Sequence, residues 1–167
     1  KLQAMNIVLA GMPGCGKTTV AEVFSRRGIK VYDTDAEIVK NHGAISDIFA
    51  DFGEQYFRDL ETQIVEMLSV LNGVVIATGG GCLLRSRNVN LFKANGKIVF
   101  LRTGIKTLLK RVEGDTARPL LQGDTRARLE KLYNERIDIY EAAADIIIDT
   151  DELSPVQVAD AIAEKIK

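Results

Sequence analysis

Short apolar runs rich in β-branched residues alternate along the chain with longer segments of helical periodicity. The runs occupy residues 6–10, 30–34, 73–78, 97–103 and 144–150. Several are almost continuously apolar, which is typical of parallel strands covered on both faces. Helical spacing is found at 17–27, 35–42, 45–71, 84–94, 105–112, 124–143 and 155–166. The alternation predicts an α/β fold in which helices cover both faces of a parallel sheet.

No repeat, low-complexity tract or linker divides this pattern, so we expect residues 1–167 to form a single domain. The least regular segment, residues 113–123, is predicted to be a mobile loop. The last helix begins with Ser154, Pro155 and Gln157, which predict a capping box behind a proline at the first helical position. Residues 1–4 precede Met5 and are interpreted as a remnant of recombinant expression.

The composition disfavours some classes of binding partner. Apolar residues make up 46% of the chain and charged residues 27%, with an interspersed net charge of −1, which disfavours a nucleic-acid partner or an anionic membrane surface. No apolar stretch approaches about 18 residues. The two cysteines, Cys15 and Cys82, lack the spacing of a zinc site or disulfide framework. We therefore expect a cytoplasmic protein without nucleic-acid or membrane partners.

The segment GMPGCGKT, residues 11–18, lies between the first apolar run and the first helical stretch. It carries the full P-loop pattern, in which glycines let backbone N–H groups converge on phosphate oxygens at a helix N-terminus. In such a loop Lys17 reaches the β- and γ-phosphates and the Thr18 hydroxyl coordinates Mg²⁺. A glycine-rich turn without a ligand is the alternative, but the strand before it and the helix after it favour nucleotide binding.

A P-loop by itself is compatible with a nucleotide-driven switch and with a kinase. A GTPase switch needs the guanine-reading pattern N-K-x-D and a D-x-x-G after the third strand, and neither occurs in this chain. A kinase that passes the γ-phosphoryl group to a small acceptor is therefore favoured. Its acceptor is expected beyond the carboxyl ends of the strands, where ligands of open parallel sheets bind.

Two strand ends carry candidate acceptor groups. Asp33 and Asp35 end the second strand, and residues two apart in an extended segment point the same way. One carboxylate would then lie near Mg²⁺ and the other accept a hydrogen bond from the substrate; the alternative is that Asp35 only caps the next helix. Gly79, Gly80 and Gly81 end the third strand and indicate close approach of backbone to a ligand, or else a flexible turn.

Three charged residues fall on or beside apolar helix faces. On an ideal helix over 54–71, Glu61 lies inside the apolar arc and Arg58 at its margin. Arg136 lies in the middle of the apolar arc of 124–143. Since buried charges need partners, Glu61 would pair with one arginine, and positive charge would remain. A carboxylate-bearing acceptor held by guanidinium groups would balance it, although a purely internal ion pair is the alternative.

Arg118 lies in the predicted mobile loop, within the sequence ARPLL. It is a candidate for contacting the γ-phosphate when such a loop closes and excludes water. A solvated loop arginine is the alternative.

Taken together, these segments resemble the shikimate kinase family. They are GMPGCGKT, DTD, GAISDIFADFGEQYFRDLE, VIATGGG, ARPLL and LYNERIDIYEAAADIIIDT, and they occur in the family's order over nearly all of 6–167. The resemblance implies ATP- and Mg²⁺-dependent phosphorylation of the 3-hydroxyl of shikimate, in the chorismate pathway. It also implies a three-layer P-loop kinase fold with a five-stranded parallel sheet in the order 2-3-1-4-5 and a lid near 113–123. A sibling kinase of another anionic polyol, such as gluconate, is the alternative.

The resemblance further implies roles for individual residues and a monomer acting on ATP and shikimate. The implied catalytic residues are Lys17, Asp35 and Arg118. The implied substrate-binding residues are Asp35, Arg58, Glu61, Gly79, Gly80, Gly81 and Arg136, with an apolar wall of Ile45, Phe49 and Phe57. The implied nucleotide-binding residues are Gly11, Met12, Pro13, Gly14, Cys15, Gly16, Lys17, Thr18, Thr19 and Arg118, with Arg111 and Pro155 beside adenine. The implied metal-binding residues are Thr18 and Asp33.

Overall fold

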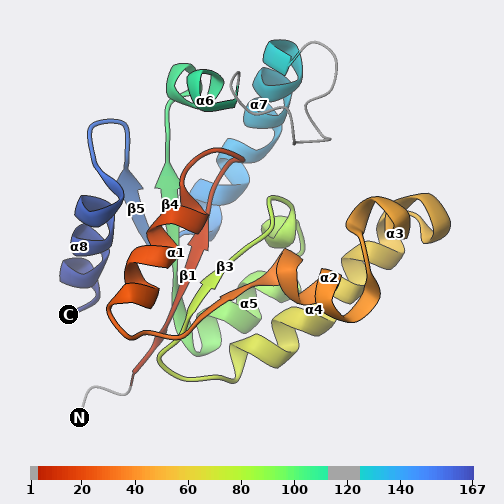
Figure 1. Cartoon of the computed structure of the whole chain (residues 1–167), viewed down its shortest axis with the longest axis horizontal. Coiled ribbons are helices and arrows are strands. Elements are labelled where there is room, and N and C mark those ends of the chain that lie inside the picture. Colours follow the sequence, from red (N-terminus) through yellow and green to blue (C-terminus); the bar gives the residue numbers. More distant parts are fainter. Residues whose placement is uncertain (1–3, 113–124) are drawn as a thin grey trace.

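A computed structural model describes residues 4–112 and 125–167 of the chain (Figure 1). The predicted mobile loop at 113–123, with Arg118, lies outside the described residues. The strands are β1 (Asn6–Ala10), β2 (Val31–Asp33), β3 (Val75–Ala77), β4 (Gly96–Arg102) and β5 (Ile146–Asp149). The α-helices are α1 (Lys17–Arg26), α2 (Thr34–His42), α3 (Ile45–Phe52), α4 (Glu54–Ser69), α5 (Ser86–Ala94), α6 (Ile105–Val112), α7 (Thr125–Ala143) and α8 (Pro155–Ile166).

All five strands are parallel and form one sheet in the order β2-β3-β1-β4-β5. This confirms the predicted fold class and strand order. The central strand β1 is buried along its whole length, with Val8 paired to Ile76 of β3 on one side and to Ile98 of β4 on the other. Burial of both faces explains why the central strands are almost continuously apolar.

The helices form a layer on each side of the sheet (Figure 1). Helix α1 packs on β1 and β3 and against α8, whereas α5 and α7 pack on β4, with α4 beside α5. At the carboxyl ends of the strands, α2 and α3 extend beyond β2 and β3, and α6 lies beyond β4 (Figure 1). Groups from several elements therefore meet at this one edge. None of the described helices is both long and apolar enough to cross a membrane.

The predicted single helical stretch over 45–71 is wrong, because Gly53 divides it into α3 and α4. Gly53 has φ +85° and ψ 174°, a conformation that L side chains rarely adopt, and a regular helix cannot pass through it. The stretch predicted at 84–94 is also subdivided: a short 3₁₀ helix, η1 (Cys82–Leu84), precedes α5. The predicted capping box is confirmed, since Ser154 Oγ accepts from Gln157 N and Ser154 N donates to Gln157 Oε1.

Candidate active site

The P-loop joins β1 to α1 and requires glycine at its first position. Gly11 has φ +152°, and a Cβ there would lie 2.7 Å from Cys15 Sγ and 2.9 Å from the carbonyl oxygen of Leu101. The Lys17 ammonium donates to the carbonyl oxygens of Gly11 at 2.6 Å and Met12 at 3.3 Å. A cation therefore lies over the loop at the N-terminus of α1, where an anion is favoured.

Arg111 of α6 reaches the same loop, where its Nη1 donates to the carbonyl oxygen of Gly14 at 2.9 Å. Gly14 and Gly16 have φ of +84° and +96°, and Gly16 is the left-handed N-cap of α1. Pro155 begins α8 and is exposed, and no described contact joins it to Arg111. Of the other predicted nucleotide-binding residues, Met12 and Cys15 are buried, Pro13 is half-buried, and Thr18 and Thr19 are exposed.

Thr18 and Asp33, the two predicted metal ligands, line one hollow of about 170 Å³ between α1 and β2. Asp33 Oδ1 accepts a hydrogen bond of 2.9 Å from Ala36 N and so caps α2. Hydroxyl and carboxylate oxygens suit Mg²⁺, which usually takes one or two protein ligands together with substrate phosphates and water. Within residues 4–112 and 125–167, no group of three or more His, Cys, Asp or Glu side chains is placed to hold a metal ion.

Asp35 lies in the first turn of α2 rather than in β2, which ends at Asp33. The expectation that both aspartates share an extended segment is therefore wrong, and the helix cap is Asp33, not Asp35. Burial raises the pKa of Asp35 most, followed by the charge of Asp33, whereas Lys17 and Arg58 lower it. No described residue donates a hydrogen bond to the Asp35 carboxylate, so it is free to accept one from a ligand.

The three consecutive glycines 79–81 approach three charged side chains in turn. A Cβ on the first would meet the carboxylate of Asp35; on the second it would lie 2.6 Å from Arg136 Nη1; on the third it would meet the guanidinium of Arg58. These charged groups come from α2, α7 and α4. The close approach expected from the sequence is thus found, and it joins residues that are up to about a hundred positions apart.

Two hydroxyl groups from outside hold this glycine segment. Thr34 Oγ1 accepts from Gly79 N at 2.8 Å, and the Tyr140 hydroxyl donates to the carbonyl oxygen of Gly80 at 2.6 Å. In the described part of the chain, the amide N–H groups of Gly80 and Gly81 have no acceptor. They are therefore available to a ligand at this edge of the sheet.

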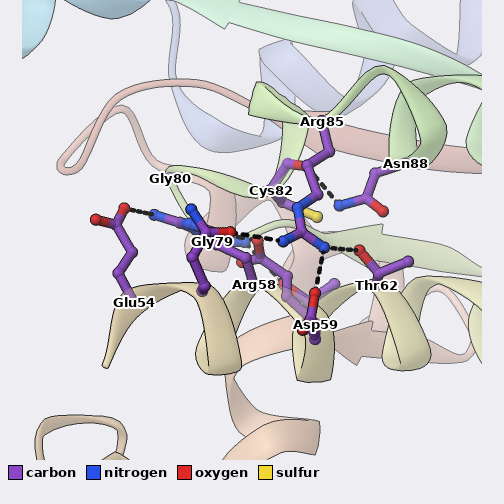
Figure 2. Close-up of polar contacts among 12 residues, drawn as sticks. Glu54, Arg58, Asp59, Thr62, Gly79, Gly80, Cys82, Arg85 and Asn88 are labelled. Atoms are coloured by element: carbon purple, nitrogen blue, oxygen red, sulfur yellow. Dashed lines mark hydrogen bonds and ion pairs between the residues drawn. The ribbon is translucent and has the colours of Figure 1, made fainter. Parts of the chain in front are cut away.

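Arg58 is paired inside the protein, as its position on α4 predicted. Its Nη1 donates to Glu61 Oε1 at 3.0 Å and its Nη2 to Glu54 Oε1 at 3.5 Å (Figure 2). Glu61 is only 1% exposed, and its Oε2 has no partner among the described residues. Burial raises the pKa of Glu61, an effect that the charge and hydrogen bond of Arg58 oppose. By contrast, Arg136 has no ion pair within the described residues, so positive charge is left over at the site.

An apolar surface lies beside these charges. The rings of Phe49 and Phe57, from α3 and α4, are 4.8 Å apart between centroids, and the guanidinium carbon of Arg58 lies 5.2 Å from the Phe57 centroid. Ile45, at the start of α3, is half-buried and packs on the hydrophobic core. The three predicted wall residues therefore come from the two helices that Gly53 separates.

Arg85 was not predicted from the sequence, although it ties the end of η1 to three residues of α4 that lie about one helical turn apart. Its guanidinium donates to Asp59 at 2.8 Å, to Gln55 at 3.1 Å and to Thr62 at 3.4 Å (Figure 2). The predictions also missed Thr34 and Tyr140. Tyr140 follows Arg136 by one helical turn, and this spacing was the only sequence signal for it.

The chain is similar to shikimate kinases in both sequence and structure. The family model described as shikimate kinase matches residues 13–167. Shikimate kinase of Caldicellulosiruptor bescii is 42% identical over 160 residues, covering 94% of this chain and 92% of its own length. That of Chromobacterium violaceum is 44% identical over 150 residues, covering 88% and 82%. The solved structure of shikimate kinase from Acinetobacter baumannii in complex with shikimate has a TM-score of 0.89 at 34% identity, covering 98% of this chain and 93% of that one. The Aquifex aeolicus structure has a TM-score of 0.82 at 36% identity, covering 97% and 96%.

Proposed function

The chain belongs to the shikimate kinase family, and we propose that it transfers the γ-phosphoryl group of ATP to the 3-hydroxyl of shikimate. The choice of shikimate as the acceptor rests on one observation: Arg58 and Arg136 lie against the glycine backbone of 79–81. Arg58 has internal carboxylate partners, and Arg136 has none in the described part of the chain. An acceptor that brings one carboxylate would neutralise the remaining charge.

The phosphoryl donor binds at the P-loop in this proposal. Backbone N–H groups of 11–18 and the Lys17 ammonium hold the β- and γ-phosphates, and Arg111 borders the nucleotide. Thr18 and Asp33 would hold Mg²⁺, because both line the same hollow and offer oxygen atoms. When bound, the ion neutralises the charge that develops on the phosphate oxygens.

The acceptor binds between α2, α4 and α7. Arg136 and Arg58 hold its carboxylate, the free N–H groups of Gly80 and Gly81 donate to its oxygens, and Phe57 covers its ring. Asp35 accepts a hydrogen bond from the hydroxyl that attacks. Its raised pKa makes it a better proton acceptor, but a loose transition state needs little proton abstraction, so orientation of the hydroxyl is its main contribution.

The test is ADP release measured by a coupled assay with shikimate, with gluconate and without an acceptor. We expect turnover that depends on shikimate; equal turnover with gluconate would favour a sibling kinase, and equal hydrolysis without acceptor would refute acceptor transfer.

Arg136→Ala should raise the shikimate KM at least 100-fold and leave the ATP Kd within about twofold. Equal losses for both ligands would argue against the carboxylate contact.

The expectations about oligomeric state, cellular compartment and Arg118 are also part of this proposal. We propose that the protein is a single-domain monomer. We also propose that it acts in the cytoplasm, because Cys15 and Cys82 are both free thiols and thiols stay reduced in that compartment. Light scattering after size exclusion tests the monomer. A mass of twice 18.3 kDa would contradict it. Arg118, which lies outside the described residues, stays a proposed contact of the transferring phosphate.

A further inference from the structure

The Tyr140 hydroxyl lies where α7 meets the glycine segment after β3. It donates a hydrogen bond of 2.6 Å to the carbonyl oxygen of Gly80. Arg136 lies one turn earlier on α7, and its Nη1 is 2.6 Å from the point where a Cβ of Gly80 would stand. The Tyr140 hydroxyl is 3.9 Å from that same point. A neutral hydroxyl, a guanidinium and a glycine backbone therefore converge at one place.

The core, rather than the glycine segment, sets the position of this hydroxyl. Tyr140 is 2% exposed, and its ring packs on Phe100 of β4 with centroids 5.2 Å apart. Burial raises the pKa of Tyr140 to about 12, against the opposing charge of Arg136. The hydroxyl is thus protonated at neutral pH and able to donate to Gly80.

Both neighbours of this hydroxyl need an external support. The glycine segment has no side chains with which to anchor itself, and three glycines in a row leave the backbone free to adopt many conformations. Arg136 has no carboxylate partner in the described part of the chain, and a long side chain without a partner samples many rotamers. The hydroxyl of Tyr140 restrains the Gly80 backbone through its hydrogen bond, at the point where Arg136 approaches that backbone.

We infer that Tyr140 is a positioning residue of the acceptor site: its hydroxyl holds the Gly80 backbone beside Arg136 at the spacing that a carboxylate-bearing acceptor needs. The inference rests on the proposed function. It assigns to Tyr140 no contact with substrate, and it predicts an effect that is specific to the acceptor.

Tyr140→Phe is the direct test, because it removes one oxygen and keeps the ring on Phe100. We expect the shikimate KM to rise about tenfold, as for the loss of one hydrogen bond near a charge. The ATP KM and kcat should change less than about twofold. Tyr133→Phe is the matched control: Tyr133 lies on the same helix, makes no hydrogen bond to a described residue, and should leave all three constants unchanged.

A double-mutant cycle with Arg136→Lys then asks whether Tyr140 acts through Arg136. Because lysine lacks the planar fork, Tyr140→Phe should cost less than about threefold in that background. Replacement of Tyr140 by 4-aminophenylalanine, which keeps a donor, should restore most of the acceptor affinity. Fully independent effects, or no rescue, would overturn the inference.

Three further outcomes separate this inference from the proposed function. A folded Tyr140→Phe with an unchanged shikimate KM, or with equal losses for both substrates, would overturn the positioning role alone. A Tyr140→Phe chain that fails to fold would also overturn it, because the hydroxyl would then serve the fold. A wild-type protein without shikimate-dependent turnover would instead refute the proposed function.

Discussion

Asp35→Asn should stabilise the folded protein while it abolishes most of the activity. The pKa of Asp35 is raised from 3.8, first by burial and then by Asp33, and Lys17 and Arg58 offset only part of this. A carboxyl with a raised folded-state pKa binds its proton more tightly when folded. Its contribution to stability is therefore fully present below about pH 4 and is lost as the pH rises through the folded-state pKa. Asparagine has the same shape and never ionises.

The expected gain in stability of the Asp35→Asn variant is modest, because Asp35 is half-buried and two cations lie near it. We expect the free energy of unfolding to rise by about 1 kcal/mol at pH 8, within the range that single stabilising substitutions commonly give. For a chain of this length this corresponds to a rise in Tm of about 2–4 °C. The loss of kcat should be about 10²–10⁴-fold, since the attacking hydroxyl loses its charged hydrogen-bond acceptor.

The assay is thermal unfolding without ligands at intervals from pH 4 to pH 8, paired with coupled ADP release. The difference in Tm between Asp35→Asn and wild type should be near zero at pH 4 and grow as the pH rises. Asp138→Asn is the control: Asp138 is exposed on α7 with no described partner, so neither Tm nor kcat should change appreciably. An Asp35→Asn chain that melts below wild type at pH 8 would refute the burial argument.

Gly80→Ala places a Cβ 2.6 Å from Arg136 Nη1, and we expect shikimate turnover to fall at least 100-fold while ATP binding, measured by equilibrium titration, is kept. Wild-type turnover would mean that this close approach is not needed. Arg85→Gln weakens the attachment of α4 to η1 and should raise the shikimate KM about threefold; Arg87→Gln, which loses only one exposed ion pair to α4, should not. Equal effects would assign both arginines to the fold. Thr18→Val should raise the Mg²⁺ concentration for half-maximal turnover about tenfold, and an unchanged value would exclude Thr18 as a ligand.

The fold was largely predictable because its signals are local. Several of the parallel strands are almost continuous apolar runs, and the P-loop is a contiguous pattern of eight residues between a strand and a helix. The break at Gly53 was missed for a physical reason: helical periodicity continues on both sides of it, so the apolar pattern hides the change of direction. Only the φ of +85° at one glycine separates α3 from α4.

The acceptor site was predictable only where its residues break the apolar pattern. Glu61 and Arg136 stand on apolar helix faces, and a charge in that position demands a partner, so the sequence indicates them without the structure. Tyr140 fits the apolar arc of α7 and gives no such signal, although its hydroxyl touches the same backbone. The apolar pattern therefore does not indicate a neutral hydrogen-bond donor, such as the Tyr140 hydroxyl, that lies beside a charged residue on an apolar face. In α/β folds of this kind, a buried Thr or Tyr one turn from an arginine on an apolar helix face is therefore a residue whose hydroxyl should be tested by mutation.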